Sequence, residues 1–370
     1  MSLLRRYLAK EILVPFAAGV LFLTQILLAT QLLAQAQILF GSGVSILDIG
    51  AVIADLLPHL LGYVLPIAFL LGAVLGVGRL AEDREVVALG AAGLSPAYLV
   101  PVPLALGVAV AAVGVWLGLW VAPAGLDAAR VRLTGIVKRN VTNDVRPGTF
   151  YDQIPGYTLY AERVNGGRWE NVLISDRSDP SAPVLALARR GRLEPVGAGQ
   201  EMRLVLDAGE VHRESVDAGQ YVVAEFGRGD LVLGLGTALS DRSTLVRGGR
   251  EDVPGFLARI ADARAAGDEK TARRLEASLH RRVAAPLAVI PFALLALPLG
   301  ATRRGGRAFG IGATFLVVVV HYLLLRGGEV MATRGALPAV LALQLPTLVL
   351  SAIGVALIAL QARRGPGAVR

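Results

Sequence analysis

One short segment of the chain carries the charge pattern of a docking site for another protein. It reads GRLAEDREVVALG over residues 78–90 and interrupts a long apolar run. It contains five charged residues, Arg79 and the run Glu82, Asp83, Arg84 and Glu85, beside the apolar residues Leu80, Val86 and Leu89. A short helix with these residues, ended by Gly93 and Pro96, could bind in a groove on a partner protein. The same charges could instead keep a solvated loop out of a membrane, and the residues alone leave both interpretations open.

Two groups of basic residues could bind an anion such as a lipid phosphate. The first group is Arg130, Arg132, Lys138 and Arg139, and the second is Arg281 and Arg282. Guanidinium groups suit phosphate because they offer paired hydrogen-bond donors. Each group also adjoins an apolar segment, so the same side chains could anchor helices at a membrane surface. Both interpretations stay open at this point.

The sequence lacks the common catalytic motifs. It contains no GxxxxGK[ST] phosphate loop and no HExxH, and its four histidines (His59, His212, His280 and His321) are scattered. His321 lies in an apolar segment, where an ionisable group is a functional candidate. A neutral histidine packed between helices is the simpler interpretation. We therefore expect no catalytic residues, no metal site and no cofactor bound by this chain.

The elements that would position these residues are mostly membrane helices. Of 370 residues, 54% are hydrophobic, and six windows are apolar and long enough, or nearly so, to cross a bilayer. The predicted helices cover residues 12–34, 57–78, 98–121, 283–300, 308–325 and 338–360. The spacing of Gly72 and Gly76, and of Gly114 and Gly118, favours close helix packing rather than a ligand site.

Basic residues in the short loops predict the orientation. Eleven lysines and arginines fall in the short segments on one side of the predicted helices and two on the other, so both termini are expected in the cytoplasm. The start, RRYLAK, resembles a twin-arginine signal, and Ala34-Gln35-Ala36 resembles a cleavage site. The apolar run is longer than an ordinary signal, and five further helices follow it. We therefore expect the first helix to be retained.

The charge of the central part argues against nucleic-acid binding. Between Asp127 and Arg282 lie 46 of the 66 charged residues, 24 basic and 22 acidic. The high pI near 10.2 therefore comes mainly from the membrane segments and their loops, where it reports orientation. With both termini in the cytoplasm, the central part is expected outside it. The chain has no cysteine, so this part must hold together without disulfides.

The central part changes from helical to strand periodicity. From about Gly148 to Leu233 the chain reads as roughly six short strands separated by turn residues, which favours a β-sandwich, jelly roll or open barrel. Asn165-Gly166 predicts a hairpin turn, and GAGQ and DAGQ make similar breaks. Edge strands of such a fold would need a cover or a partner. A helical pattern resumes at Asp252, a plausible N-cap, and runs to Arg282.

The order of these features resembles the LptF/LptG family of lipopolysaccharide export permeases over nearly the whole chain. The segments that carry the resemblance are RRYLAKEIL, GRLAEDREVVALGAAGLS, WVAP and EASLHRRVAAPLAVIPFALLALPLG. RRGGRAFG, followed by HYLLLRGGE, matches the F-type subunit better than the G-type.

The resemblance implies a membrane α-helical fold of six helices with an inserted, all-β, jellyroll-like domain. Residues 1–126 would hold helices one to three, with a cytoplasmic coupling helix at about 79–90. Residues 127–250 would form the periplasmic β-domain with a helical lead-in, 251–282 a periplasmic helical connector, and 283–370 helices four to six.

The same resemblance implies a function and partners. The chain would be a non-catalytic permease subunit that extracts lipopolysaccharide from the inner membrane and passes it toward the outer membrane. It would assemble with a second LptF/LptG-type permease, a cytoplasmic ATPase dimer of the LptB type, which uses the ATP, and a periplasmic jellyroll bridge protein of the LptC/LptA type. Glu85 matches the family's coupling-helix glutamate, so the charged segment would contact the ATPase.

A different class of function is a membrane-anchored receptor or sensor with an extracytoplasmic β-domain. Six helices split three and three, without a cytoplasmic domain to report a signal, argue against it. An intramembrane enzyme is disfavoured because no charged pair lies within a predicted span. Co-purification with an ATPase separates the transporter from both alternatives.

Overall fold

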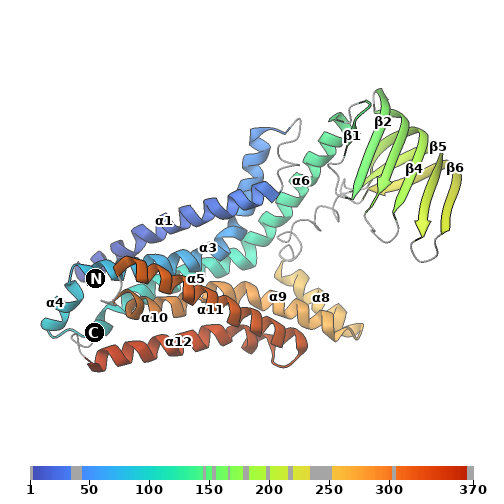
Figure 1. Cartoon of the computed structure of the whole chain (residues 1–370). Helices are drawn as coiled ribbons and strands as arrows, with labels where there is room; N and C mark the ends of the chain where they lie inside the picture. Colours follow the sequence, from blue (N-terminus) through green and yellow to red (C-terminus); the bar gives the residue numbers. More distant parts are fainter. Residues whose placement is uncertain are drawn as a thin grey trace. The chain divides into compact units, whose positions relative to one another are not determined.

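The computed structural model describes most of the chain (Figure 1). The described residues are 3–34, 44–144, 147–151, 156–165, 167–177, 183–196, 201–215, 220–233, 252–301 and 306–364. The chain divides into two compact units. We call Met1–Leu28, Leu57–Ala124 and Glu251–Arg370 the helical unit, and Ala29–Leu56 and Gly125–Arg250 the sheet unit.

Six helical stretches in the described residues are long and apolar enough to cross a membrane. They are Leu3–Ala34, Ile46–Glu82, Pro96–Ile136, Glu269–Gly300, Phe309–Arg334 and Ala339–Arg363. Each overlaps one predicted window, so the prediction of six membrane helices is confirmed. All six are longer than the predicted windows, because the helices continue into the residues that flank each apolar stretch.

The helices themselves begin and end as follows. They are α1 (Leu3–Ala34), α3 (Ile46–Glu82), α4 (Glu85–Ala91), η1 (Pro96–Leu99), α5 (Pro101–Trp116), the π-helical η2 (Leu117–Val121), α6 (Ala122–Asp144), α8 (Val253–Ala265), α9 (Glu269–Leu287), α10 (Val289–Gly300), α11 (Gly306–Arg334) and α12 (Ala339–Arg364).

The helical unit is built around α10. Nine of its twelve residues are buried, among them Phe292 and Val289, and a helix that is buried on every side belongs at the centre of a bundle. The core around it draws on residues of α1, α3, α5 and α12 as well. The helix α4 lies at the end of the helical unit where α1 begins and α12 ends (Figure 1).

Glycines let the helices approach closely, as predicted. A Cβ on Gly72 of α3 would lie 2.7 Å from the Cα of Phe16 in α1, and one on Gly76 would lie 2.7 Å from the carbonyl oxygen of Glu11. Gly114 makes the same kind of contact, since its Cβ would lie 2.8 Å from Pro286 of α9. Small residues are needed wherever two helix backbones touch in this way.

A helical hairpin, α8–α9, follows the sheet unit in sequence. The Asp252 carboxylate accepts a hydrogen bond from the Gly255 N–H at 3.0 Å, which confirms the predicted N-cap. Gly267, with φ +75°, reverses the chain between the two helices. Asp268 then caps α9 by accepting from the Thr271 N–H at 3.0 Å.

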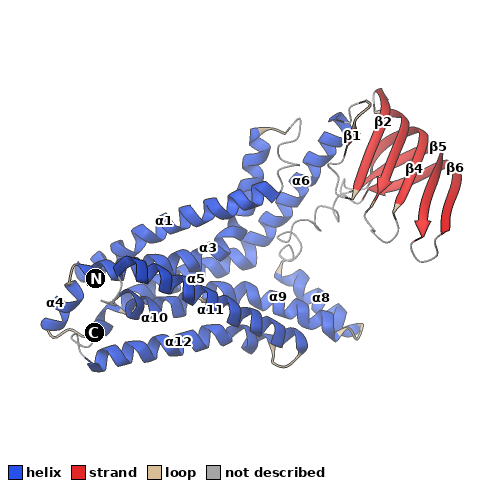
Figure 2. Cartoon of the chain, in the orientation of Figure 1, coloured by secondary structure: helices blue, strands red, loops and turns tan. Residues whose placement is uncertain are grey.

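The sheet unit contains one six-stranded antiparallel sheet (red in Figure 2). Its strands pair in sequence order: β1 (Phe150–Tyr151), β2 (Tyr157–Asn165), β3 (Arg168–Asp176), β4 (Val184–Val196), β5 (Glu201–Ser215) and β6 (Gln220–Leu233). The fold class, membrane helices with an inserted all-β domain, is therefore confirmed.

The core of this unit explains why a single sheet suffices. A jelly roll covers its apolar face with a second sheet. Here the buried side chains of the strands, such as Leu159 and Trp169, cluster with residues of α6 and with Val52 and Leu56 of α3. Among the described residues, helices therefore take the place of the facing sheet.

The predicted hairpin joins β2 to β3. Asn165 pairs with Arg168, and Gly167 has φ +82°, the conformation that a two-residue hairpin turn requires. Gly166 and most of the GAGQ and DAGQ segments lie outside the described residues. The strands on either side of those segments are paired, at Val196 with Glu201 and at Ser215 with Gln220.

Candidate functional site

The charged segment forms a turn between two helices rather than one helix. α3 continues to Glu82, and α4 begins at Glu85, which differs from the single helix expected over about 79–90. Arg84 lies between them with φ 59°, a left-handed conformation that ends regular helical hydrogen bonding. We call residues 82–85 the α3–α4 turn. Leu80 keeps α3 helical up to the turn because its side chain is fully buried in the bundle.

The end of α4 is fixed by its backbone. The Leu94 N–H donates to the Leu89 carbonyl and the Gly93 N–H to the Gly90 carbonyl, each at 3.0 Å. Gly93 has φ +82°, which completes a Schellman motif. Ser95 then caps η1, whose first residue is Pro96. The predicted end of this helix is confirmed.

The two sides of the segment face opposite surroundings. Glu82, Asp83 and Arg84 are exposed. Val86 and Leu89 instead pack against the core of the helical unit. The apolar side, which the sequence left available for a partner, therefore attaches α4 to its own chain. The surface offered to a partner is the charged turn.

Glu85 differs from its neighbours because it is half-buried and bound within the chain. The Tyr7 hydroxyl of α1 donates a hydrogen bond to its Oε1 at 3.2 Å. One turn further along α1, Glu11 forms an ion pair with Arg79 of α3 at 2.9 Å. Sequence reasoning missed Tyr7 and Glu11. Their spacing of four residues, which places them on one helix face, was the available signal.

The basic residues predicted to bind a lipid phosphate are divided between the two units. In the sheet unit, Arg132 of α6 pairs with Asp55 of α3 at 2.8 Å, and Arg130 also has an interaction partner within the chain. The side chains of Lys138 and Arg139 lie outside the described residues.

In the helical unit, Arg281 pairs with Glu329 of α11 at 3.3 Å. The same carboxylate also holds Arg326 at 2.9 Å. The guanidinium of Arg282 lies 4.5 Å from the ring centroid of Phe256. The described arginines are thus already engaged by carboxylates or rings of their own chain.

His321 is packed as an interior residue. Its side chain is buried in α11, and its ring meets that of Phe292 edge to face, with centroids 5.4 Å apart. This geometry favours the interpretation as a packed histidine. Among the described residues, no group of three or more histidines and carboxylates is arranged to hold a metal ion.

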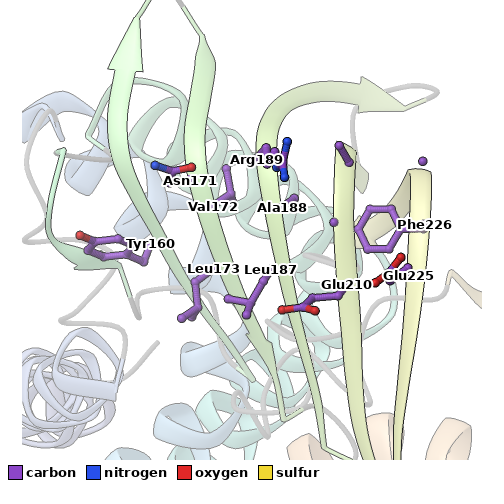
Figure 3. Close-up of a pocket in the computed structure, with 13 residues that line it drawn as sticks. Tyr160, Asn171, Val172, Leu173, Leu187, Ala188, Arg189, Glu210, Glu225 and Phe226 are labelled. Carbon is purple, nitrogen blue, oxygen red and sulfur yellow. The ribbon is translucent and has the colours of Figure 1, made fainter.

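A groove of about 1000 Å³ crosses the sheet (Figure 3). One row of lining residues runs from strand to strand through directly paired positions: Tyr160, Leu173, Leu187, Glu210 and Glu225. Beside it the strand pairing is interrupted along a line of positions that includes Asn171 and Ala208. Both have positive φ, 50° and 54°. The lining of the groove combines apolar side chains with Glu210, Glu225 and Arg189, so it carries charges of both signs.

The strand β6 forms a long edge of the sheet. It pairs with β5 along one side and is the last strand in the sheet order. Tyr221, Val222 and Val223 are about half exposed or more. Within the described residues no strand pairs with the other side of β6, and backbone groups of this kind beside exposed apolar side chains can pair with another strand.

The chain matches the model of one protein family, described as lipopolysaccharide export system permease LptF/LptG, over residues 6–360. A comparison with curated proteins gives no match. The family match includes all six candidate membrane helices almost completely and the whole of the described sheet. The chain therefore belongs to the LptF/LptG family and is a multi-pass inner-membrane permease of lipopolysaccharide export.

Proposed function

We propose that this permease is one subunit of an ATP-driven transporter that extracts lipopolysaccharide from the inner membrane and passes it to a periplasmic bridge. The observation that carries the proposal is the α3–α4 turn: exposed charges held at a fixed place on a family member's helical unit. A second LptF/LptG-type permease would complete the membrane part. ATP would be hydrolysed by a separate ATPase dimer of the LptB type.

The turn suits coupling because it is polar outside and anchored inside. Glu82, Asp83 and Arg84 are exposed, while Leu80, Val86 and Leu89 lie in or against the core. A partner that pulls on these charges therefore displaces α3 and α4 rather than a loose loop. Glu85, which matches the family's coupling glutamate, engages Tyr7 through Oε1, and in this proposal its other oxygen serves the ATPase.

The orientation follows from the basic residues in the short loops. The positive-inside rule puts the α3–α4 turn and both termini in the cytoplasm and the sheet unit in the periplasm. There the β6 edge would pair with a strand of a bridge protein of the LptC/LptA type, since adding a strand satisfies backbone groups that are already aligned. The acyl chains of lipopolysaccharide would pass through the periplasm along the sheet of this chain and that of the bridge protein.

The proposal also gives the basic residues a role in binding the lipid headgroup. Arg281 would have to exchange Glu329 for a phosphate, and Arg132 would have to exchange Asp55. Such exchange is physically reasonable because both pairs are partly exposed, and exposed ion pairs are worth only about 0–1 kcal/mol.

Site-specific photocrosslinking in cells tests the function and the orientation together. A crosslinker at Asp83 should trap the ATPase, and one at Val222 should trap a periplasmic strand-rich protein. Leu257 of α8 is 55% exposed; it serves as the control and should trap neither.

Charge reversal then tests which carboxylate matters most. Glu85→Lys should abolish the Asp83 crosslink and lipopolysaccharide export, because a partly buried charge contact broken on one side costs several kcal/mol. Glu82→Lys at an exposed site should weaken both less. A crosslink from Asp83 to no ATPase, or normal export by Glu85→Lys, would show that the coupling assignment is wrong.

A further inference from the structure

Two side-chain contacts tie α1 to both sides of the α3–α4 turn. On the near side, Glu11 of α1 pairs with Arg79 of α3 at 2.9 Å. On the far side, Tyr7 of α1 donates to Glu85, the first residue of α4, at 3.2 Å. Since Tyr7 and Glu11 lie on the same face of α1, one helix face bridges the turn.

The bridging part of α1 cannot move independently of α3. Leu8 and Ile12, which lie between the two contacts and next to them, are fully buried. The backbone of α1 also touches α3 directly at Gly76 and Gly72, where even a Cβ would collide. Displacing α1 along α3 would therefore break side-chain packing as well as the polar contacts.

The start of α4 lacks a side-chain cap of its own and is held by tertiary contacts. A seven-residue helix is not stable by itself in water. Its N-cap is Arg84, whose side chain makes no capping hydrogen bond. The Tyr7–Glu85 hydrogen bond is thus a polar contact that, beside the packing of Val86 and Leu89 against the core, holds the start of α4 against α1.

We propose that Tyr7 is a positioning residue that links α4 to α1, so that displacement of the α3–α4 turn moves α1 together with α3. The role in transport rests on the proposed function, because a partner must displace the turn. The mechanical link itself is a property of this chain and can be measured without any partner.

The link is tested by distance measurements between spin labels in the purified full-length chain. Since the native chain has no cysteine, Lys10→Cys on α1 and Ala88→Cys on α4, both at exposed positions, give two unique labels. With Tyr7 present the distance distribution should be narrow. In Tyr7→Phe the ratio of conformers with α4 detached from α1 to conformers with it attached should rise about tenfold, because a hydrogen bond to a charged acceptor shifts an equilibrium by roughly that factor. This rise should show as a second population in the distance distribution.

Two further variants make the result specific. Tyr98→Phe removes a hydroxyl from η1 but keeps the ring that Arg5 covers, so its distribution should match the native one. Glu85→Ala should broaden the distribution as Tyr7→Phe does, and the double variant should be no broader than either, since both remove one contact. A narrow distribution in Tyr7→Phe, or additive broadening in the double variant, overturns the proposal.

The transport role is tested in the complex. Tyr7→Phe should keep the Asp83 crosslink to the ATPase, while lipopolysaccharide released per ATP should fall in proportion to the unlinked population that the spin labels measure. Normal release per ATP in this variant overturns the role of Tyr7. Loss of the ATPase crosslink in the native chain instead overturns the proposed function and leaves the spin-label result standing.

Discussion

The contact between α1 and α3 makes a quantitative prediction for Gly72→Ala. An added Cβ would lie 2.7 Å from three atoms of Phe16, its N, Cα and Cβ. Two of these belong to the backbone of α1, so no side-chain rotation relieves the collision, and the two helices must separate. Gly62 of the same helix is a matched control, because its added Cβ would meet nothing within 4 Å.

The magnitude follows from two opposing effects. Replacing glycine by alanine inside a helix stabilises it by about 0.5–1 kcal/mol at either position. Overpacking a closely packed contact costs about 1–3 kcal/mol, and only Gly72 incurs this cost. The free energy of unfolding should therefore rise slightly in Gly62→Ala, and Gly72→Ala should be less stable than Gly62→Ala by about 1–3 kcal/mol.

Unfolding of the purified chain in mixed detergent micelles, followed by the fluorescence of its tryptophans, measures this difference. The linked Tyr7–Glu85 contact gives a second readout, since separation of α1 from α3 should also broaden the spin-label distances described above. Equal stability of the two alanine variants would refute the close approach of α1 and α3, and with it the basis for a rigid link.

Two other predictions concern the sheet and the helical hairpin. Ala208→Gly should raise the free energy of unfolding of the sheet unit by about 0.5–1 kcal/mol. The substitution removes left-handed strain of about 1–2 kcal/mol at φ 54°, which exceeds the stabilisation that the added backbone freedom of glycine gives the unfolded chain. A loss of stability in denaturant titration would contradict this. Hydrogen bonds from the Thr271 side chain and backbone N–H lower the pKa of Asp268, so its stabilising effect is complete above its ordinary pKa near 4 and is lost as the pH falls through the lower folded value. Asp268→Ser keeps a cap that does not titrate. The difference in thermal midpoint between the native chain and this variant should therefore shrink as the pH falls from 6 to 3. A constant difference would show that Asp268 titrates as it does in the unfolded chain.

The membrane helices and strands could be predicted because each leaves a periodic or continuous pattern in the sequence. Long apolar windows have one stable solution in a bilayer, and the hairpin between β2 and β3 follows from residues that accept positive φ. The covering of the sheet could not be predicted in this way. Strand alternation shows that one face is apolar, but the pattern is the same whether a second sheet or, as here, α6 and Val52 of α3 lie against it.

The ends of the charged segment were predictable and its internal break was not. Gly93 and Pro96 have strong conformational preferences, so they mark the end of α4. Arg84 has no preference for the left-handed conformation it adopts, and it takes that conformation because Leu80 on one side and Val86 on the other are both drawn into the same core. Tertiary packing thus overrides a local helical pattern at that residue.

The polar pairs were the part that sequence alone could not give. The residues of the Tyr7–Glu85, Glu11–Arg79 and Arg281–Glu329 pairs lie 48 to 78 positions apart, and no periodicity connects residues at such separations. These pairs bear on the proposed function. An arginine that is paired with Glu329 binds an anion less well than an unpaired one, and a carboxylate held by Tyr7 passes a displacement to α1 better than a freely moving one. Residue type therefore marks the charged positions in the sequence, whereas the partners that the fold gives them determine which of them the proposed function could use for lipid and which for coupling.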